Sequence, residues 1–85
     1  MLLKRTIAQL DLGTLSPERA REMGELGYLQ WLGALPASSN YLHEAMYAYT
    51  LAAPAARRSN AVAVFCDLLI ATTTTPVEPL AMMMA

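Results

Sequence analysis

The chain has 85 residues, which is enough for one domain at most. Hydrophobic residues make up 55% of it and charged residues 15%, whereas typical globular chains carry about 25% charged residues. The formal net charge is −1, and the basic residues lie in separated pairs along the chain. This pattern argues against nucleic-acid binding, which needs a basic face that collects phosphate contacts.

Cys66 is the only cysteine, so an internal disulfide is excluded. The apolar run at the N-terminus is broken at once by Lys4 and Arg5, which argues against a secretory signal. We therefore expect a soluble protein of a reducing cytoplasm. The many alanines, and the excess of arginine over lysine, are typical of a bacterial genome rich in G and C.

Two apolar stretches, residues 45–56 and 61–71, raise the question of membrane insertion. Each is shorter than the roughly 20 residues that a spanning helix needs, and Arg57 and Arg58 separate them. Membrane crossing is therefore not expected, although the apolar composition keeps membrane association open as an alternative.

A first short helix is predicted for residues 2–10. Leu3, Ile7 and Leu10 recur there at the spacing of one helix face. Gly13 follows, and glycine readily takes the left-handed conformation found after helix ends.

A second helix is predicted to begin at Ser16 and Pro17, because serine caps free backbone N–H groups and proline fits the first helical turn. It is expected to run to Leu35, since a proline follows. Residues 18–25 are highly charged, whereas residues 26–35 are apolar in every direction around the helix axis. Such a helix is enclosed by its own domain or by another chain.

The apolar half of this second helix is the predicted interaction site. Trp31 is the expected anchor, because buried Trp and Tyr dominate the energetics of interfaces, although core packing explains the same pattern. Glycines at positions 24, 27 and 33 weaken the helix and permit close approach of another backbone. The predicted interaction residues are Leu26, Tyr28, Leu29, Trp31, Leu32 and Leu35.

A third helix is predicted after residues 36–40, a short loop with cap-competent residues at its end. It is expected to reach about Ala53, because Pro54 forces a break or a new first turn. His43, Tyr47 and Thr50 are expected opposite the apolar stripe. That stripe consists of Leu42, Ala45, Met46, Tyr49, Ala52 and Ala53.

A fourth element is predicted from Pro54 or Ser59 to about Ala71. Its length favours a helix, but its β-branched residues also fit a buried strand, so residues 60–71 are predicted to be either helix or strand. The expected helical stripe consists of Ala61, Val62, Phe65, Leu68 and Leu69. We divide the chain into a helical domain, residues 1–72, and an extended or disordered tail, residues 73–85.

The sequence has few residues of the types that act as nucleophiles or metal ligands. His43, Cys66 and Asp67 are expected on different elements, and nothing in the sequence fixes their geometry as a nucleophile set. One histidine and one cysteine cannot close a structural zinc site, and the glutamates of residues 18–25 are typical of a solvated helix face. We therefore expect no enzyme, no catalytic residue, no metal and no cofactor.

The predicted fold is an all-α small bundle of three to four short helices with an irregular C-terminal tail. The predicted function is a non-catalytic protein–protein interaction module that acts through an apolar helix face. Its partner is either another protein or a second copy of the chain in a homodimer. The alternative is a small accessory subunit associated with a membrane protein complex.

Overall fold

The computed structural model describes residues 2–74, and this part of the chain holds four helices and no strand. The all-α prediction is therefore confirmed, and residues 60–71, left open between helix and strand, are helical. The expected tail of residues 73–85 lies outside the described residues from residue 75 onward, and its first two positions, 73 and 74, belong to the last helix, which was expected to end at about Ala71. None of the described helices is both long and apolar enough to cross a membrane. The helices are α1 Leu2–Leu10, α2 Pro17–Gly33, α3 Tyr41–Ala56 and α4 Asn60–Thr74.

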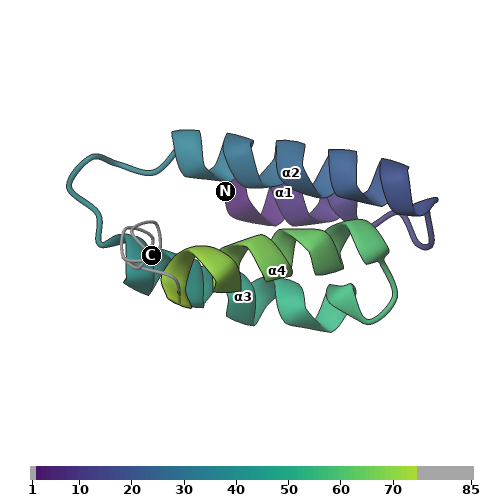
Figure 1. Cartoon of the computed structure of the whole chain (residues 1–85). Helices are drawn as coiled ribbons and strands as arrows, with labels where there is room; N and C mark the ends of the chain where they lie inside the picture. Colours follow the sequence, from purple (N-terminus) through teal and green to yellow (C-terminus); the bar gives the residue numbers. More distant parts are fainter. Residues whose placement is uncertain (1, 75–85) are drawn as a thin grey trace, which may run out of the picture.

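Successive helices run in opposite directions, so the connections gather at two ends of the bundle (Figure 1). The α1–α2 and α3–α4 connections lie at one end, which we call the two-loop end. The α2–α3 connection lies at the opposite, single-loop end. Helix α4 packs against both α2 and α3. These two helices meet across the bundle through side chains such as Tyr28 and Tyr41, whose hydroxyl oxygens are 2.8 Å apart.

The helix starts follow the predicted caps. Ser16 accepts a hydrogen bond from the N–H group of Arg19, and Pro17 is the first residue of α2. Asn40 caps α3 by accepting from the N–H group of His43 at 2.9 Å. Local side-chain chemistry therefore places both helix starts.

Two predicted helix ends need correction. Helix α2 ends at Gly33, two residues before Leu35, because the N–H group of Ala34 bonds back to Trp31 in a tightened last turn. Helix α3 passes through Pro54 and ends at Ala56. Proline costs little there, because it removes a single backbone bond in the last helical turn, on an exposed side of the helix.

Helix α3 buries its smallest residues. The predicted stripe is wrong about Leu42, Met46 and Tyr49, all of which are exposed. The reason is close packing of α3 on α4, which alanine permits and larger side chains prevent. Its buried residues are Ala45, Ala48, Ala52 and Ala55.

Close approach also governs the packing of α2. A Cβ atom added to Gly24 would lie 2.5 Å from Cγ1 of Val64 and 2.9 Å from the carbonyl oxygen of Ala61, both in α4. A Cβ atom on Gly27 would meet only the end of a flexible leucine side chain of α1. The expected close approach of another backbone is therefore confirmed at Gly24, whereas at Gly27 the near neighbour is a side chain. The expectation is wrong for Gly33, where a Cβ atom would meet nothing within 4 Å.

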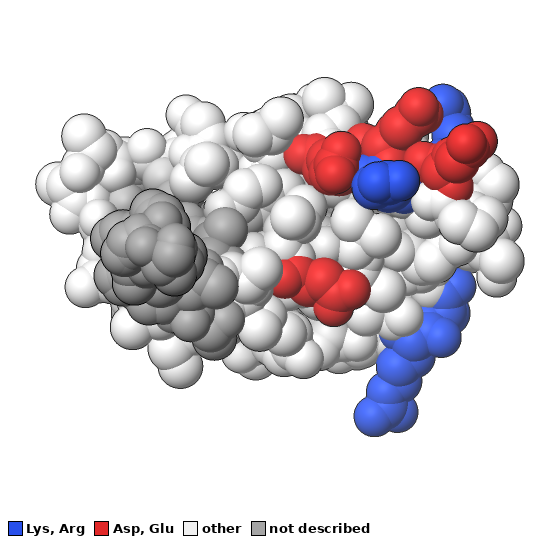
Figure 2. Space-filling model, in the orientation of Figure 1, with Lys and Arg blue, Asp and Glu red and all other residues white. Residues whose placement is uncertain are grey.

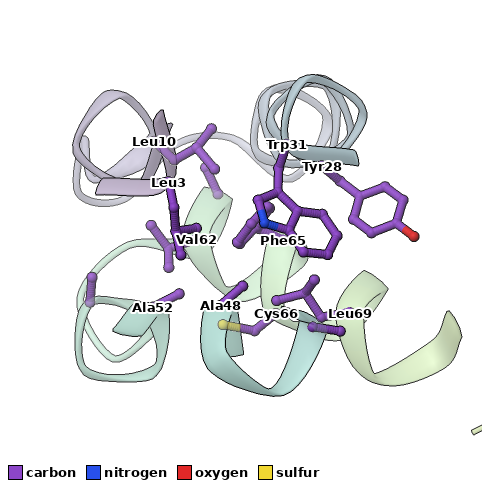
Figure 3. Packing of buried hydrophobic residues seen from close by; sticks show 13 residues of the cluster. Leu3, Leu10, Tyr28, Trp31, Ala48, Ala52, Val62, Phe65, Cys66 and Leu69 are labelled. Atoms are coloured by element: carbon purple, nitrogen blue, oxygen red, sulfur yellow. The ribbon is translucent and has the colours of Figure 1, made fainter. Parts of the chain in front are cut away.

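The core between the four helices is dominated by α4 and by one tryptophan (Figure 3). The apolar faces predicted for the first and fourth elements both point inward, and Phe65 and Leu69 are among the largest fully buried side chains. Trp31 reaches from α2 toward Phe65, with ring centroids 6.2 Å apart in an edge-to-face arrangement. Large side chains from α2 and α4 thus fill the space that the alanines of α3 leave.

Candidate functional site

The predicted anchor of the interaction site belongs to the core. Trp31 is 3% exposed and Tyr28 is also buried, so the alternative of core packing applies to Trp31, and its side chain does not lie on the surface as an anchor. The indole packs against Tyr41 and Phe65 at centroid distances of 5.8 and 6.2 Å. Because α2 turns this side toward α4, core packing explains the aromatic residues of its second half.

The leucines of the same half point elsewhere. Leu26 and Leu29 are 52% and 61% exposed, and Leu32 is exposed as well. Leu35 is partly buried against the core. The six predicted interaction residues therefore do not form one surface: the leucines at 26, 29 and 32 form an outward apolar face of α2, while the aromatic residues face inward.

A second apolar face lies on α3, and part of it belongs to the apolar stripe predicted from the sequence. Met46 is 61% exposed, and the exposed residues recur at the spacing of one helix face. We call this row the α3 ridge; it consists of Leu42, Met46, Tyr49 and the half-buried Ala53 of α3, and of Arg57, which directly follows the helix. The spacing was visible in the sequence, but nothing there showed that the row faces outward.

The α3 ridge borders a trough. Between α3 and α4 lies an open depression of about 290 Å³, lined by Met46, Tyr49 and Thr50 from α3 and by Ile70 from α4, with Ala45 and Leu69 beneath. Two further depressions share Thr50 and extend along α3, one toward Asn40 and one toward Arg57. The three depressions follow one another along α3, and we call them together the α3 trough; α4 forms a wall only of the first.

Charge is distributed unevenly over the surface. On the face shown in Figure 2, the acidic and basic residues gather over the half that carries the two-loop end, and the other half is uncharged among the described residues. Arg58 forms an ion pair with Asp11 at 2.7 Å, and this carboxylate raises the pKa of the arginine. Arg57 is exposed and makes no ion pair with any residue of 2–74.

The two-loop end is held by three polar contacts that sequence reasoning missed, which we call the polar clamp. Besides the pair of Arg58 with Asp11, the Ser59 hydroxyl donates to the carbonyl of Leu10 at 2.8 Å. The side-chain amide of Asn60 accepts from the N–H group of Leu15 and donates to its carbonyl, at 2.9 and 2.6 Å. The polar run 58–60 is the only signal in the sequence, and it does not reveal the partners.

The candidate nucleophile set is dispersed. Cys66 is buried in α4, and burial together with neighbouring Asp67 raises the pKa of its thiol to about 11. A protonated, buried thiol is a poor nucleophile at neutral pH. His43 and Asp67 are exposed on different helices. Within residues 2–74, no group of three or more His, Cys, Asp or Glu side chains is placed to hold a metal ion.

The described surface thus carries two outward apolar faces, the leucines of α2 and the α3 ridge, and the α3 ridge ends at Arg57 near the two-loop end. Neither face contains a set of polar groups that converge on one point. Comparison with models of known protein families, with curated protein sequences and with solved structures finds no match for this chain.

Proposed function

We propose that this chain is a non-catalytic helical protein–protein interaction module that acts through apolar helix faces. The observation that carries the proposal is the inverted packing of α3, which buries alanines and exposes Leu42, Met46 and Tyr49. Exposed apolar surface is unfavourable by about 25 cal/mol for each Å². Large contiguous apolar patches on a monomer therefore mark interaction sites.

The composition of the exposed faces supports a protein partner. The centre of a protein interface is depleted in charge and enriched in aromatic residues and methionine. The α3 trough has this character, with Met46 and Tyr49 on its rim and only Arg57 charged among the residues that line its three depressions. Methionine also adapts its shape to a bound surface, because its side chain is unbranched and flexible.

The leucines of α2 extend the proposal to a second face. Leu26 and Leu29 point away from the core on the helix that lies across the bundle from α3. A module with two apolar faces can bind two elements of one partner or two copies of it. Binding through the leucines alone, through the α3 trough alone, or through both is distinguished by single substitutions.

The test is affinity purification of a tagged chain from cells of the native host, with bound proteins identified by mass spectrometry. Met46→Glu and Leu29→Glu each place a charge on one apolar face, and Arg19→Gln is a control at the charged half of α2. We expect a partner that the wild type and Arg19→Gln retain and that at least one face variant loses. Equal recovery with every variant, or no specific partner with the wild type, contradicts the proposal.

A further inference from the structure

The α3 ridge has the geometry of a helix-binding surface. Its residues stand at i, i+4, i+7, i+11 and i+15, which is a line along one side of a helix. Helix α3 has 16 residues, which corresponds to about 24 Å. An amphipathic helix that binds in a groove presents apolar residues at the same spacing. A partner helix of four turns therefore matches the α3 ridge in length.

In the middle of the trough, the Thr50 hydroxyl already has a hydrogen-bond partner within the chain. Thr50 lies at the point where the three depressions meet, and its hydroxyl donates to the carbonyl of Met46 at 2.9 Å within α3 itself. The neighbouring walls are the side chains of Met46, Tyr49 and Ile70. A bound segment thus needs no polar side chain in the middle of the trough, and an apolar stripe fits it.

Arg57 places a positive charge at one end of the trough, so that the two ends differ. It lines the depression at the C-terminal end of α3 together with Pro54 and Tyr49. The adjacent Arg58 is neutralised by Asp11, whereas Arg57 has no acidic partner within residues 2–74. A carboxylate on the bound segment complements this cation, and charge complementarity of this kind fixes register and orientation.

The same charge disfavours a second copy of the chain as the occupant. In an antiparallel pairing of two α3 helices, Arg57 meets the N-terminal end of the other α3, where the helix dipole is positive and His43 is exposed. Glu44 does not compensate, because the helical spacing places it on the opposite side of α3 from Met46. In a parallel pairing, Arg57 meets its own copy. In both symmetric arrangements, Arg57 meets no acidic residue of the other α3 ridge.

We propose that the α3 trough binds an amphipathic helix of a different protein, with its apolar stripe on Met46 and Tyr49 and with acidic residues at the end that meets Arg57. The inference rests on the proposed interaction function and adds the site and the chemistry of the partner to it. The occupant is thus defined by length, by apolar spacing and by charge at one end.

The test uses the full chain and a displayed library of 16-residue helical peptides. The peptides carry fixed apolar residues at i, i+4, i+7 and i+11, and Glu, Lys, Gln or Ser at the flanking positions of both ends. Selection is run on the wild type and on Arg57→Glu, and affinities are measured by fluorescence anisotropy. Met46→Glu tests the trough, and Leu29→Glu is the matched control on the other apolar face. Circular dichroism verifies that these exposed substitutions leave the helices intact.

We expect the wild type to select peptides with Glu at one end and Arg57→Glu to select Lys at the same end. Met46→Glu and Arg57→Glu should each weaken binding of the wild-type-selected peptides roughly tenfold or more, and Leu29→Glu less than about twofold. If the selected peptides show no preference for Glu at either end, the proposal of an acidic partner is overturned. Binding that survives Met46→Glu but is lost in Leu29→Glu overturns the trough and leaves the interaction function standing.

Sedimentation separates the second copy from the partner helix. Concentration-dependent dimers of the wild type that Met46→Glu abolishes would show that the trough pairs with itself, and would overturn the proposal. A wild type that stays monomeric while binding the selected peptides supports it. If no peptide is enriched on the wild type over Met46→Glu, and purification from native cells yields no partner, the proposed function fails together with the site.

Discussion

The two ends of the bundle are held by different physics. At the two-loop end, directional contacts of Arg58, Ser59 and Asn60 fix one connection against the other. At the single-loop end, the rings of Trp31 and Tyr41 pack edge to face. Charges gather over the first end, and the exposed leucines of α2 and the hollow of α3 reach toward the second.

This difference concerns where the chain places its polar contacts and its large apolar residues. Polar contacts between loops hold one end without using large apolar side chains. Close contacts at Gly24 and at the alanines of α3 bring the helices together, and the large buried residues of α2 and α4 fill the core. The large apolar residues of α3 lie on its outer face instead.

The largest effect is expected at the single-loop end, from Trp31→Ala. Removing a buried indole costs about 3–5 kcal/mol of unfolding free energy, which is enough to unfold a domain of this size. Thermal denaturation followed by circular dichroism measures the loss. Leu29→Ala, on the exposed side of the same helix, is the control and should change stability by less than about 1 kcal/mol. Similar effects of the two variants would contradict the assignment of Trp31 to the core.

Gly24→Ala should produce the next largest loss, in the half of the bundle near the two-loop end. The added methyl group collides with Val64 and with the backbone of Ala61, and overpacking of this kind costs about 1–3 kcal/mol. Urea denaturation gives the value. Gly27→Ala is the matched control, because it meets only a flexible leucine end and should cost less. An unchanged urea midpoint for Gly24→Ala would mean that α2 and α4 pack less closely.

Asn60→Ala tests the polar clamp directly. It leaves the N–H group and the carbonyl of Leu15 without their partner, which costs about 1–3 kcal/mol. Asn60→Asp keeps the acceptor and loses the donor, so its stability should fall between those of the wild type and Asn60→Ala. Arg58→Ala should have only a small effect, because its pair with Asp11 is exposed. If Arg58→Ala lowers the free energy of unfolding as much as Asn60→Ala does, the Asn60 amide is not the principal contact of the two-loop end.

Cys66 lies in the core between the two ends. The titration and reactivity of its thiol therefore report whether the core stays closed to solvent. Burial raises the pKa of its thiol from 9.0 to about 11, so the folded protein holds this proton more tightly than the unfolded chain does. Stability from this group is complete below pH 9 and is lost as the pH rises through about 11. Thermal midpoints should fall over this range more for the wild type than for Cys66→Ala. Modification by a thiol reagent should be slow in native protein, and fast modification without unfolding would contradict the burial.

The smallest effect is expected from Gly33→Ala, and it should be stabilising. Nothing lies within 4 Å of the added methyl group, and alanine favours the helix over glycine by up to about 1 kcal/mol. Gly13→Ala is the contrasting control, because Gly13 has a φ of +80° that alanine adopts only with strain. We expect the thermal midpoint to rise for Gly33→Ala and to fall for Gly13→Ala. A loss at Gly33 would mean that the end of α2 packs against something.

The sequence by itself determined the helices. Ser16, Pro17 and Asn40 predicted two helix starts, because a cap depends on residues within three positions of it. The inward faces of α1 and α4 were also predictable, since each has one apolar stripe and a more polar opposite side. The positive φ of Gly13 follows from the same local chemistry.

Only the tertiary structure decided which apolar face is inside where a helix has more than one. Periodicity shows which residues share a face, but it does not show how closely a neighbouring helix approaches. In α3 the close approach of α4 selects alanines for the interior and turns Met46 and Tyr49 outward, while in α2 it selects Gly24 and directs Trp31 inward. The contacts of Asn60 with Leu15 bridge 45 positions, and no local pattern encodes such a distance.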